Sequence, residues 1–140
     1  MRLRLQFPPL ASFAPQHAAL AVEAARHGSK VDLDYSPESL ATVDAIIEQM
    51  RNDGIPVDKV GESLFSFGCY VGEVLVRNDG AFWRDTELTP LKDKMGLFSL
   101  IVELGNGSFC NPIGKVFKRL ENGSVDSLPQ FYEIFKVKNS

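Results

Sequence analysis

The sequence predicts an α+β fold in which about five helices cover a small antiparallel sheet of about three to four strands. Apolar residues recur at spacings of three and four before residue 80 and again after residue 111, whereas short apolar and aromatic runs bounded by glycine lie between these segments. Helices and strands are therefore segregated along the chain, which argues against repeated βαβ units. The chain has 140 residues, ten of them Phe, and is 44% hydrophobic, so we expect residues 1–140 to form one domain that needs no disulfide or metal.

The first thirty residues predict a strand followed by a helix. Polar and apolar side chains alternate from Arg2 to Phe7, which is the period of a half-buried strand, and the two prolines that follow cannot donate to a sheet ladder. We therefore expect a short edge strand. Residues 15–27 are rich in alanine and precede Gly28, a residue suited to the position after a helix, so they predict the first helix.

The second predicted helix has clear signals at both ends. Ser36 is expected to accept a hydrogen bond from a free amide at the helix start, Pro37 fits the first turn, and Gly54 ends the helix. Its apolar stripe consists of Leu40, Val43, Ile47 and Met50. Asp44 and Glu48 lie off this stripe, so we expect both carboxylates to face solvent.

The third predicted helix contains three glycines. It spans residues 57–78, and its apolar stripe consists of Val60, Leu64, Phe67, Val71, Val74 and Leu75. Gly61, Gly68 and Gly72 are interspersed with the stripe, and each costs ~1 kcal/mol of helix propensity relative to alanine. Two explanations remain open, because either another backbone or a ligand would gain from close approach to a helix without side chains.

Between residues 81 and 110 the pattern changes to that of strands. Residues 81–84 are aromatic, residues 97–104 form a nearly unbroken apolar run, and residues 108–110 return after a turn at residues 105–107. The apolar run is typical of a central strand that is covered on both faces. We expect two or three antiparallel strands in this region.

The last thirty residues predict two more helices. One opens at Pro112 and the other is capped by Asp126 or Ser127, with apolar side chains at helical spacings in both. Combining all the apolar faces, we expect one group to be buried together: Leu64, Phe67, Val71, Leu100, Val102, Val116 and Phe117.

Three segments resemble a family of small bacterial α+β domains. These are residues 68–75 (GCYVGEVL), the nearby Trp83, and residues 111–123 (NPIGKVFKRLENG) with the Asp-Ser pair at 126–127. The resemblance extends over roughly residues 33–135 and implies a bacterial origin and a stand-alone domain. The family has no assigned reaction or ligand, so the resemblance transfers no catalytic residue.

The reactive side chains form no catalytic or metal-binding pattern. His17 and His27 are ten residues apart on different turns of one predicted helix, so they cannot ligate one metal ion, and we expect each on the surface. Cys69 and Cys110 are too few and too far apart for a disulfide framework or a zinc site, and we expect both to be reduced and buried. The sequence therefore predicts no metal, no cofactor and no catalytic residue.

The chain also lacks the signals of membrane insertion and export. No apolar segment approaches the ~20 residues that cross a bilayer, and prolines and polar residues interrupt the N-terminal segment where a signal peptide would need a continuous apolar run. We therefore expect a cytoplasmic protein without membrane contact.

The charge distribution provides the main functional hypothesis. Residues 31–90 contain four Lys or Arg and twelve Asp or Glu, so the second and third helices are expected to present an acidic surface that repels nucleic acid and attracts a basic partner. We interpret the chain as a non-enzymatic protein-binding module, for example an antidote or immunity-type protein that neutralises a basic toxin. Asp44, Glu48, Asp58 and Glu62 would contact this partner. The same carboxylates are equally typical of a surface that only confers solubility.

Two further interpretations remain open. Lys115 and Arg119 are four residues apart on one helical face, which favours contact with an anion or an acidic protein. The rival to protein binding is a small-molecule-binding domain or small enzyme whose pocket lies beside Gly68, Gly72 and Trp83, because bare backbone and an aromatic wall suit a small ligand. A cavity at these residues would favour the rival, whereas a filled core would favour protein binding.

Overall fold

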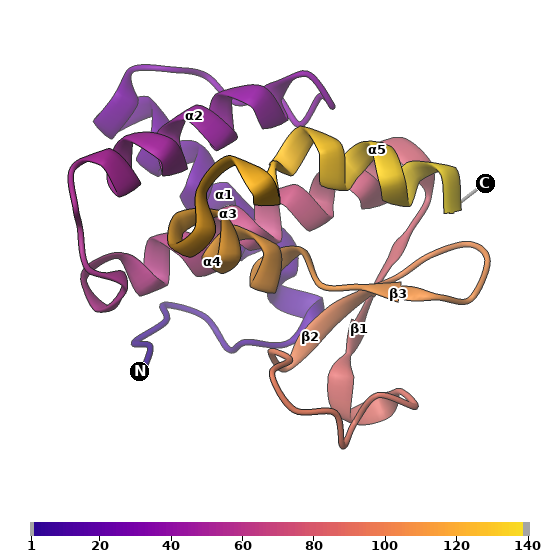
Figure 1. The fold of residues 1–140 in the computed structure, drawn as a ribbon. Coiled ribbons are helices and arrows are strands. Elements are labelled where there is room, and N and C mark those ends of the chain that lie inside the picture. Colours follow the sequence, from indigo (N-terminus) through magenta and orange to yellow (C-terminus); the bar gives the residue numbers. More distant parts are fainter. Residues whose placement is uncertain (1, 139–140) are drawn as a thin grey trace.

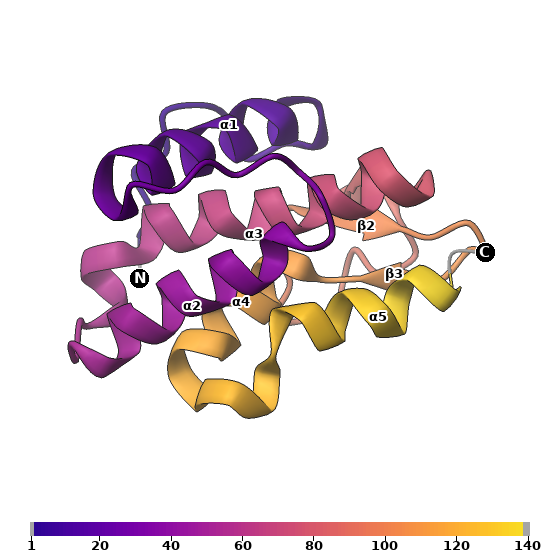
Figure 2. The same ribbon diagram turned by 90° about the horizontal axis from the view of Figure 1, so that it is seen from above.

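Helix α3 lies at the centre of the fold, with helices on two sides. The computed structural model describes residues 2–138 and contains α1 (Ala14–Ala24), α2 (Ser39–Asn52), α3 (Val57–Asp79), α4 (Pro112–Asn122) and α5 (Leu128–Lys138). Figure 2 shows α1 on one side of α3 and α2, α4 and α5 on the other. Every residue of α3 from 64 to 75 is buried, so this helix is covered around its whole circumference.

A three-stranded antiparallel sheet lies at one end of the helical part (Figure 1). Its strands are β1 (Phe82–Asp85), β2 (Leu100–Glu103) and β3 (Phe109–Cys110), in the order β1-β2-β3. Val102 of the central strand lies opposite Trp83 on one side and Cys110 on the other. The predicted α+β class is confirmed, and β2 is the central strand as expected, although only four residues of the predicted eight-residue run pair with neighbours.

One hydrophobic core connects the helices to the sheet. Six of the seven residues expected to be buried together belong to it: Leu64, Phe67, Val71, Leu100, Val102 and Val116. Phe117, the seventh, is only partly buried and packs against the edge of the core. Its ring is therefore available at the surface of α4.

Two glycines of α3 allow close approach of other elements. A Cβ atom at Gly68 would lie 2.5 Å from Cα of Ile113 in α4, and one at Gly72 would lie 2.2 Å from Cζ2 of Trp83 in β1. Real Cβ atoms do not approach other heavy atoms this closely, so alanine at either position would require a shift of the neighbour. Close approach of another backbone, the first of the two explanations, is therefore confirmed at Gly68, whereas at Gly72 the close neighbour is a side chain, the indole of Trp83.

The N-terminal segment is extended, but it is not the predicted edge strand. Burial alternates along residues 2–7 as expected, with Leu3, Leu5 and Phe7 partly buried, yet the segment pairs with no strand. It lies against the helices instead, where the backbone N–H of Arg4 donates to Oε2 of Glu62 at 2.8 Å. The alternation therefore results from one face resting on helices, a situation that the period alone does not distinguish from a sheet.

His17 is completely buried, contrary to the expectation of a surface histidine. Its Nε2 lies 2.9 Å from the carbonyl oxygen of Pro8, and its ring contacts Phe7 and Phe65 edge-on at centroid distances of 5.8 and 5.0 Å. The N-terminal segment folds back over α1 and covers this side chain. His27, by contrast, is exposed as expected, and its ring lies 3.2 Å from Glu23.

Capping signals hold at the later helices but not at the first, where Gly28 lies inside a π-helical turn (Ala25–Ser29) and Lys30 takes the left-handed conformation with φ 58°. Ser36 Oγ accepts the N–H of Ser39 at 3.1 Å, although the helix begins at Ser39 rather than at Pro37. Gly80 adopts a left-handed conformation with φ 74° directly after α3. Ser127, one of the two predicted caps of the last helix, accepts the N–H of Gln130 at 3.3 Å.

No helix among residues 2–138 has the combination of length and apolar character that a membrane crossing requires.

The contact at Gly68 leads to a stability prediction. Gly68→Ala should lower the free energy of unfolding by ~1–3 kcal/mol, because the added methyl overpacks the contact with the Ile113 backbone. Gly28→Ala is the matched control, since a Cβ there meets nothing within 4 Å, and we expect it to change stability by less than ~1 kcal/mol. Urea denaturation followed by circular dichroism measures both, and equal stability of the two variants would contradict the packing of α4 on α3.

Candidate functional site

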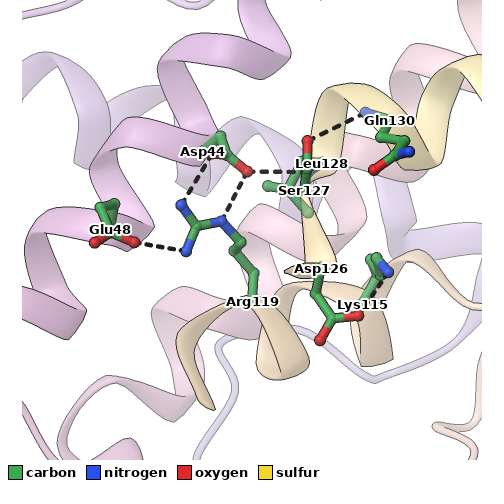
Figure 3. Close-up of polar contacts among 8 residues, drawn as sticks. All are labelled: Asp44, Glu48, Lys115, Arg119, Asp126, Ser127, Leu128 and Gln130. Carbon is green, nitrogen blue, oxygen red and sulfur yellow. Dashed lines mark hydrogen bonds and ion pairs between the residues drawn. The ribbon is translucent and has the colours of Figure 1, made fainter. Parts of the chain in front are cut away.

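Arg119 joins three helices through a buried ion-pair network. Its side chain is 3% exposed, and its Nε and Nη2 donate to the two carboxylate oxygens of Asp44 at 2.9 and 3.1 Å, while Nη1 donates to Oε1 of Glu48 at 2.7 Å (Figure 3). Oδ1 of Asp44 also accepts the backbone N–H of Leu128 at 2.9 Å. The Asp44 carboxylate of α2 therefore accepts hydrogen bonds from both α4 and the first residue of α5.

This network corrects the expectation that Asp44 and Glu48 face solvent. Their side chains are 20% and 35% exposed and point toward Arg119 of α4. The hydrogen bond to Asp44 raises the pKa of Arg119 above its usual value, so the guanidinium stays charged. Two carboxylates that were expected to bind a basic partner are thus paired, within the molecule, with the arginine that was expected to bind an anion.

The other three predicted contact residues differ from one another in environment. Asp58 is exposed in the first turn of α3, whereas Glu62 is half-buried and accepts the N–H of Arg4. Lys115 forms an ion pair of 2.7 Å with Asp126 (Figure 3). Hydrogen bonds from Lys115 and then from Asn122 hold the pKa of Asp126 below its ordinary value. Among the six predicted contact residues, Asp58 is therefore the one that is exposed.

The surroundings of Trp83 are filled by the chain itself. Glu73, only 3% exposed, accepts the indole N–H of Trp83 at 2.9 Å and the Nε–H of Arg77 at 2.8 Å. Glu73 precedes Arg77 by four residues, a spacing that predicts an exposed ion pair on the helix surface. The pair is present, but its carboxylate is buried, because β1 covers that side of α3. Trp83 occupies the space in front of Gly72 and Ile113 occupies that in front of Gly68, where the rival interpretation placed a ligand.

Both cysteines are buried free thiols, as expected. Burial raises the pKa of Cys110 to about 12, and burial followed by the charge of Glu73 raises the pKa of Cys69. Both thiols therefore remain protonated near neutral pH, which is unfavourable for a nucleophile. In the part of the chain that the structure describes, no group of three or more His, Cys, Asp or Glu side chains is arranged to hold a metal ion.

Two neighbouring hollows border α4. A larger hollow of about 570 Å³ lies between loop residues 94–98 and α4, and a smaller one of about 240 Å³ lies between α4 and α5. Both are lined by Asn111, Gly114 and Lys118. We call this surface the α4 groove. It is lined by residues 94–98, Asn111, Gly114, Lys115, Phe117, Lys118, Phe131 and Phe135.

The α4 groove combines an apolar floor with positive charge. The rings of Phe98 and Phe117 are 5.2 Å apart at the floor of the larger hollow, and the side chain of Met95, which is 93% exposed, lies at its rim. Lys94 and Lys118 are exposed, and neither forms a direct ion pair within residues 2–138. None of the residues that line the two hollows carries a carboxylate.

Sequence reasoning missed this groove, although one signal was present. Met95 lies in a short loop segment rich in Lys and Asp, residues 92–96, where a large apolar side chain has no strand or helix period to direct it inward. The polar loop around Met95 therefore predicts that this side chain is exposed, but the sequence does not place it beside other apolar residues. Phe117 was assigned to the core because it continues the apolar stripe of α4, yet it lies at the edge of that stripe and is partly exposed.

Comparison with known proteins adds no function: a scan against protein-family models finds no match, and searches of curated proteins and of solved structures find none either. A function for this chain is therefore inferred from its own geometry.

The Arg119 network leads to a ranked stability prediction. Asp44→Ala should cost roughly 3–5 kcal/mol, because it leaves the buried guanidinium without its two-point partner and the N–H of Leu128 without an acceptor. Glu48→Ala should cost less than ~1 kcal/mol, since Glu48 is more exposed and Asp44 still pairs with Arg119. Thermal and urea denaturation of both variants measures the difference, and equal losses would contradict the central role of Asp44.

The buried thiols lead to a prediction about reactivity. In the native protein at mildly alkaline pH, neither Cys69 nor Cys110 should react with a disulfide reagent such as DTNB, because both are protonated and inaccessible. Both should react once the protein is unfolded in guanidinium. Rapid modification of one thiol in the folded state, with its position mapped by mass spectrometry, would show that one of these sites is open.

Proposed function

We propose that this chain is a protein-binding module and that the α4 groove is its docking surface. The observation that carries this proposal is the open, apolar groove beside the exposed side chain of Met95, with aromatic rings at its floor. Exposed apolar surface of this kind is typical of sites that bind other proteins, in which Met and aromatic residues are enriched. Both hollows are open to solvent rather than enclosed, which suits a segment of a partner chain better than a buried small molecule.

The position of this surface changes the charge expected of the partner. Asp44 and Glu48, which were expected to attract a basic partner, are engaged by Arg119. The groove instead presents the charges of Lys94 and Lys118, so we propose a partner segment that carries acidic residues. An antidote that neutralises a basic toxin would have to use the acids that remain exposed, such as Asp58.

The small-molecule alternative has less support. It depended on free space beside Gly68, Gly72 and Trp83, and these positions are packed against one another and against Ile113. A filled core at these residues was the outcome that favours protein binding. This packing argues against a ligand beside Gly68 and Gly72, and it says nothing about the α4 groove.

The exposed methionine provides a test of the docking surface. Met95→Ser should weaken the affinity for a partner captured from cells by roughly 10- to 100-fold, because burying a Met side chain contributes about 1.5–3 kcal/mol. Leu88→Ser is the matched control: Leu88 is 82% exposed on the same long connection between β1 and β2 but does not line the groove. Surface plasmon resonance with the captured partner measures both dissociation constants.

Capture of a protein by the wild-type chain is not sufficient support by itself. The proposal requires that Met95→Ser loses affinity while Leu88→Ser retains it. If both variants bind as tightly as wild type, or if both lose affinity equally, the partner docks elsewhere and the α4 groove is not the site.

A further inference from the structure

We infer that the occupant of the α4 groove is an acidic peptide segment in which Asp or Glu residues flank a large apolar side chain. This inference rests on the proposed function and specifies the chemistry of the partner. It follows from how charge and apolar surface are distributed over the groove.

The positive charge lies on both sides of the larger hollow. Lys94 belongs to the loop and Lys118 to α4, and both side chains line this hollow. Lys115, which lines the smaller hollow, is already paired with Asp126 at 2.7 Å. Lys94 and Lys118 form no direct ion pair in the described part of the chain, although the charge of Lys118 also acts on Asp126. A segment crossing between these two lysines can place a carboxylate near each.

The floor between the two lysines is apolar. Phe98 and Phe117 pack against each other at a centroid distance of 5.2 Å, and Leu97 completes this side of the hollow. An inorganic anion would contact the lysines and leave these rings in water, whereas an uncharged apolar segment would leave the lysine charges unused. A segment with an apolar side chain between carboxylates satisfies both features, because the apolar residue covers the rings and the carboxylates meet the lysines.

Because none of the described residues that line the α4 groove carries a carboxylate, the groove should favour acidic segments over basic ones. None of the residues that line either hollow is Asp or Glu, so a basic segment would find two like charges and no partner. The N-terminal turn of α4, with Asn111 and Gly114, also lies in both hollows. Its helix dipole adds a weak positive potential that favours carboxylates, since α4 is 11 residues long.

A random peptide library displayed on phage and panned against the full chain tests this inference. Selected peptides should be enriched in Asp and Glu next to Phe, Trp, Leu or Met. A synthetic peptide of a selected sequence should bind the Lys94→Glu/Lys118→Glu variant at least ~10-fold more weakly than wild type at low salt, and the difference should shrink as salt is added.

The control variant carries the same change of charge at other exposed lysines. Lys59→Glu/Lys92→Glu places the reversals on α3 and on the loop, at residues that line neither hollow of the α4 groove, and should bind the peptide as wild type does. Circular dichroism melting curves of both double variants establish that they are folded. Equal weakening in both would show that net charge, rather than the groove, attracts the peptide, and would overturn the inference.

The remaining outcomes separate this inference from the function it rests on. Selected peptides that lack acidic residues, yet lose affinity with Met95→Ser, would overturn the acidic occupant and leave the docking surface in place. If no selected peptide depends on Met95, both proposals fail. If instead phosphatidylserine vesicles or a single-stranded oligonucleotide bind in a manner that requires Lys94 and Lys118, while no peptide is selected, the surface recognises lipid or nucleic acid and both proposals are overturned.

Discussion

The complete burial of the middle of α3 is the constraint on which the rest of the structure depends. Residues 64–75 are covered on every side, and an 11-residue helix such as α1 or α4 covers only part of that circumference. Close approach at Gly68 and Gly72 lets Ile113 of α4 and Trp83 of β1 reach the α3 backbone, so α4 and the sheet are held against the same helix. The buried carboxylate of Glu73 then fixes the indole of Trp83 by accepting its N–H.

The Arg119 network contributes orientation more than net stability. Desolvating a guanidinium and two carboxylates costs free energy that offsets much of their attraction, so the value of the network lies in its directed hydrogen bonds. Because Arg119 must point toward Asp44 and Glu48, the rotation of α4 about its own axis is set. Lys118, one position earlier and about 100° around the helix, then lines the α4 groove. The buried ion pair thereby determines which side chains the groove presents.

Much of the fold could be predicted because its signals are local. Spacings of three and four located all five helices, and Ser36, Gly80 and Ser127 act at helix ends as their chemistry suggests. The errors concern polar residues next to an apolar stripe. His17, Asp44 and Glu73 are covered because a second element packs beside the first, and the period of one helix carries no information about how many of its sides are covered.

The α4 groove was not predictable by the same means, because it lies between a loop and two helices whose relative placement no helix or strand period specifies. The lysines of the groove belong to a chain with a net charge of −3. At long range this net charge repels an acidic partner, because the separate charges act as one. Within about 10 Å, the Debye length at 0.1 M salt, local charge dominates, so the groove attracts an acidic segment while an exposed carboxylate such as Asp58 repels it. For the acidic segment proposed as occupant, such exposed carboxylates would disfavour binding elsewhere on the surface and so add to the preference for the groove without contacting the segment.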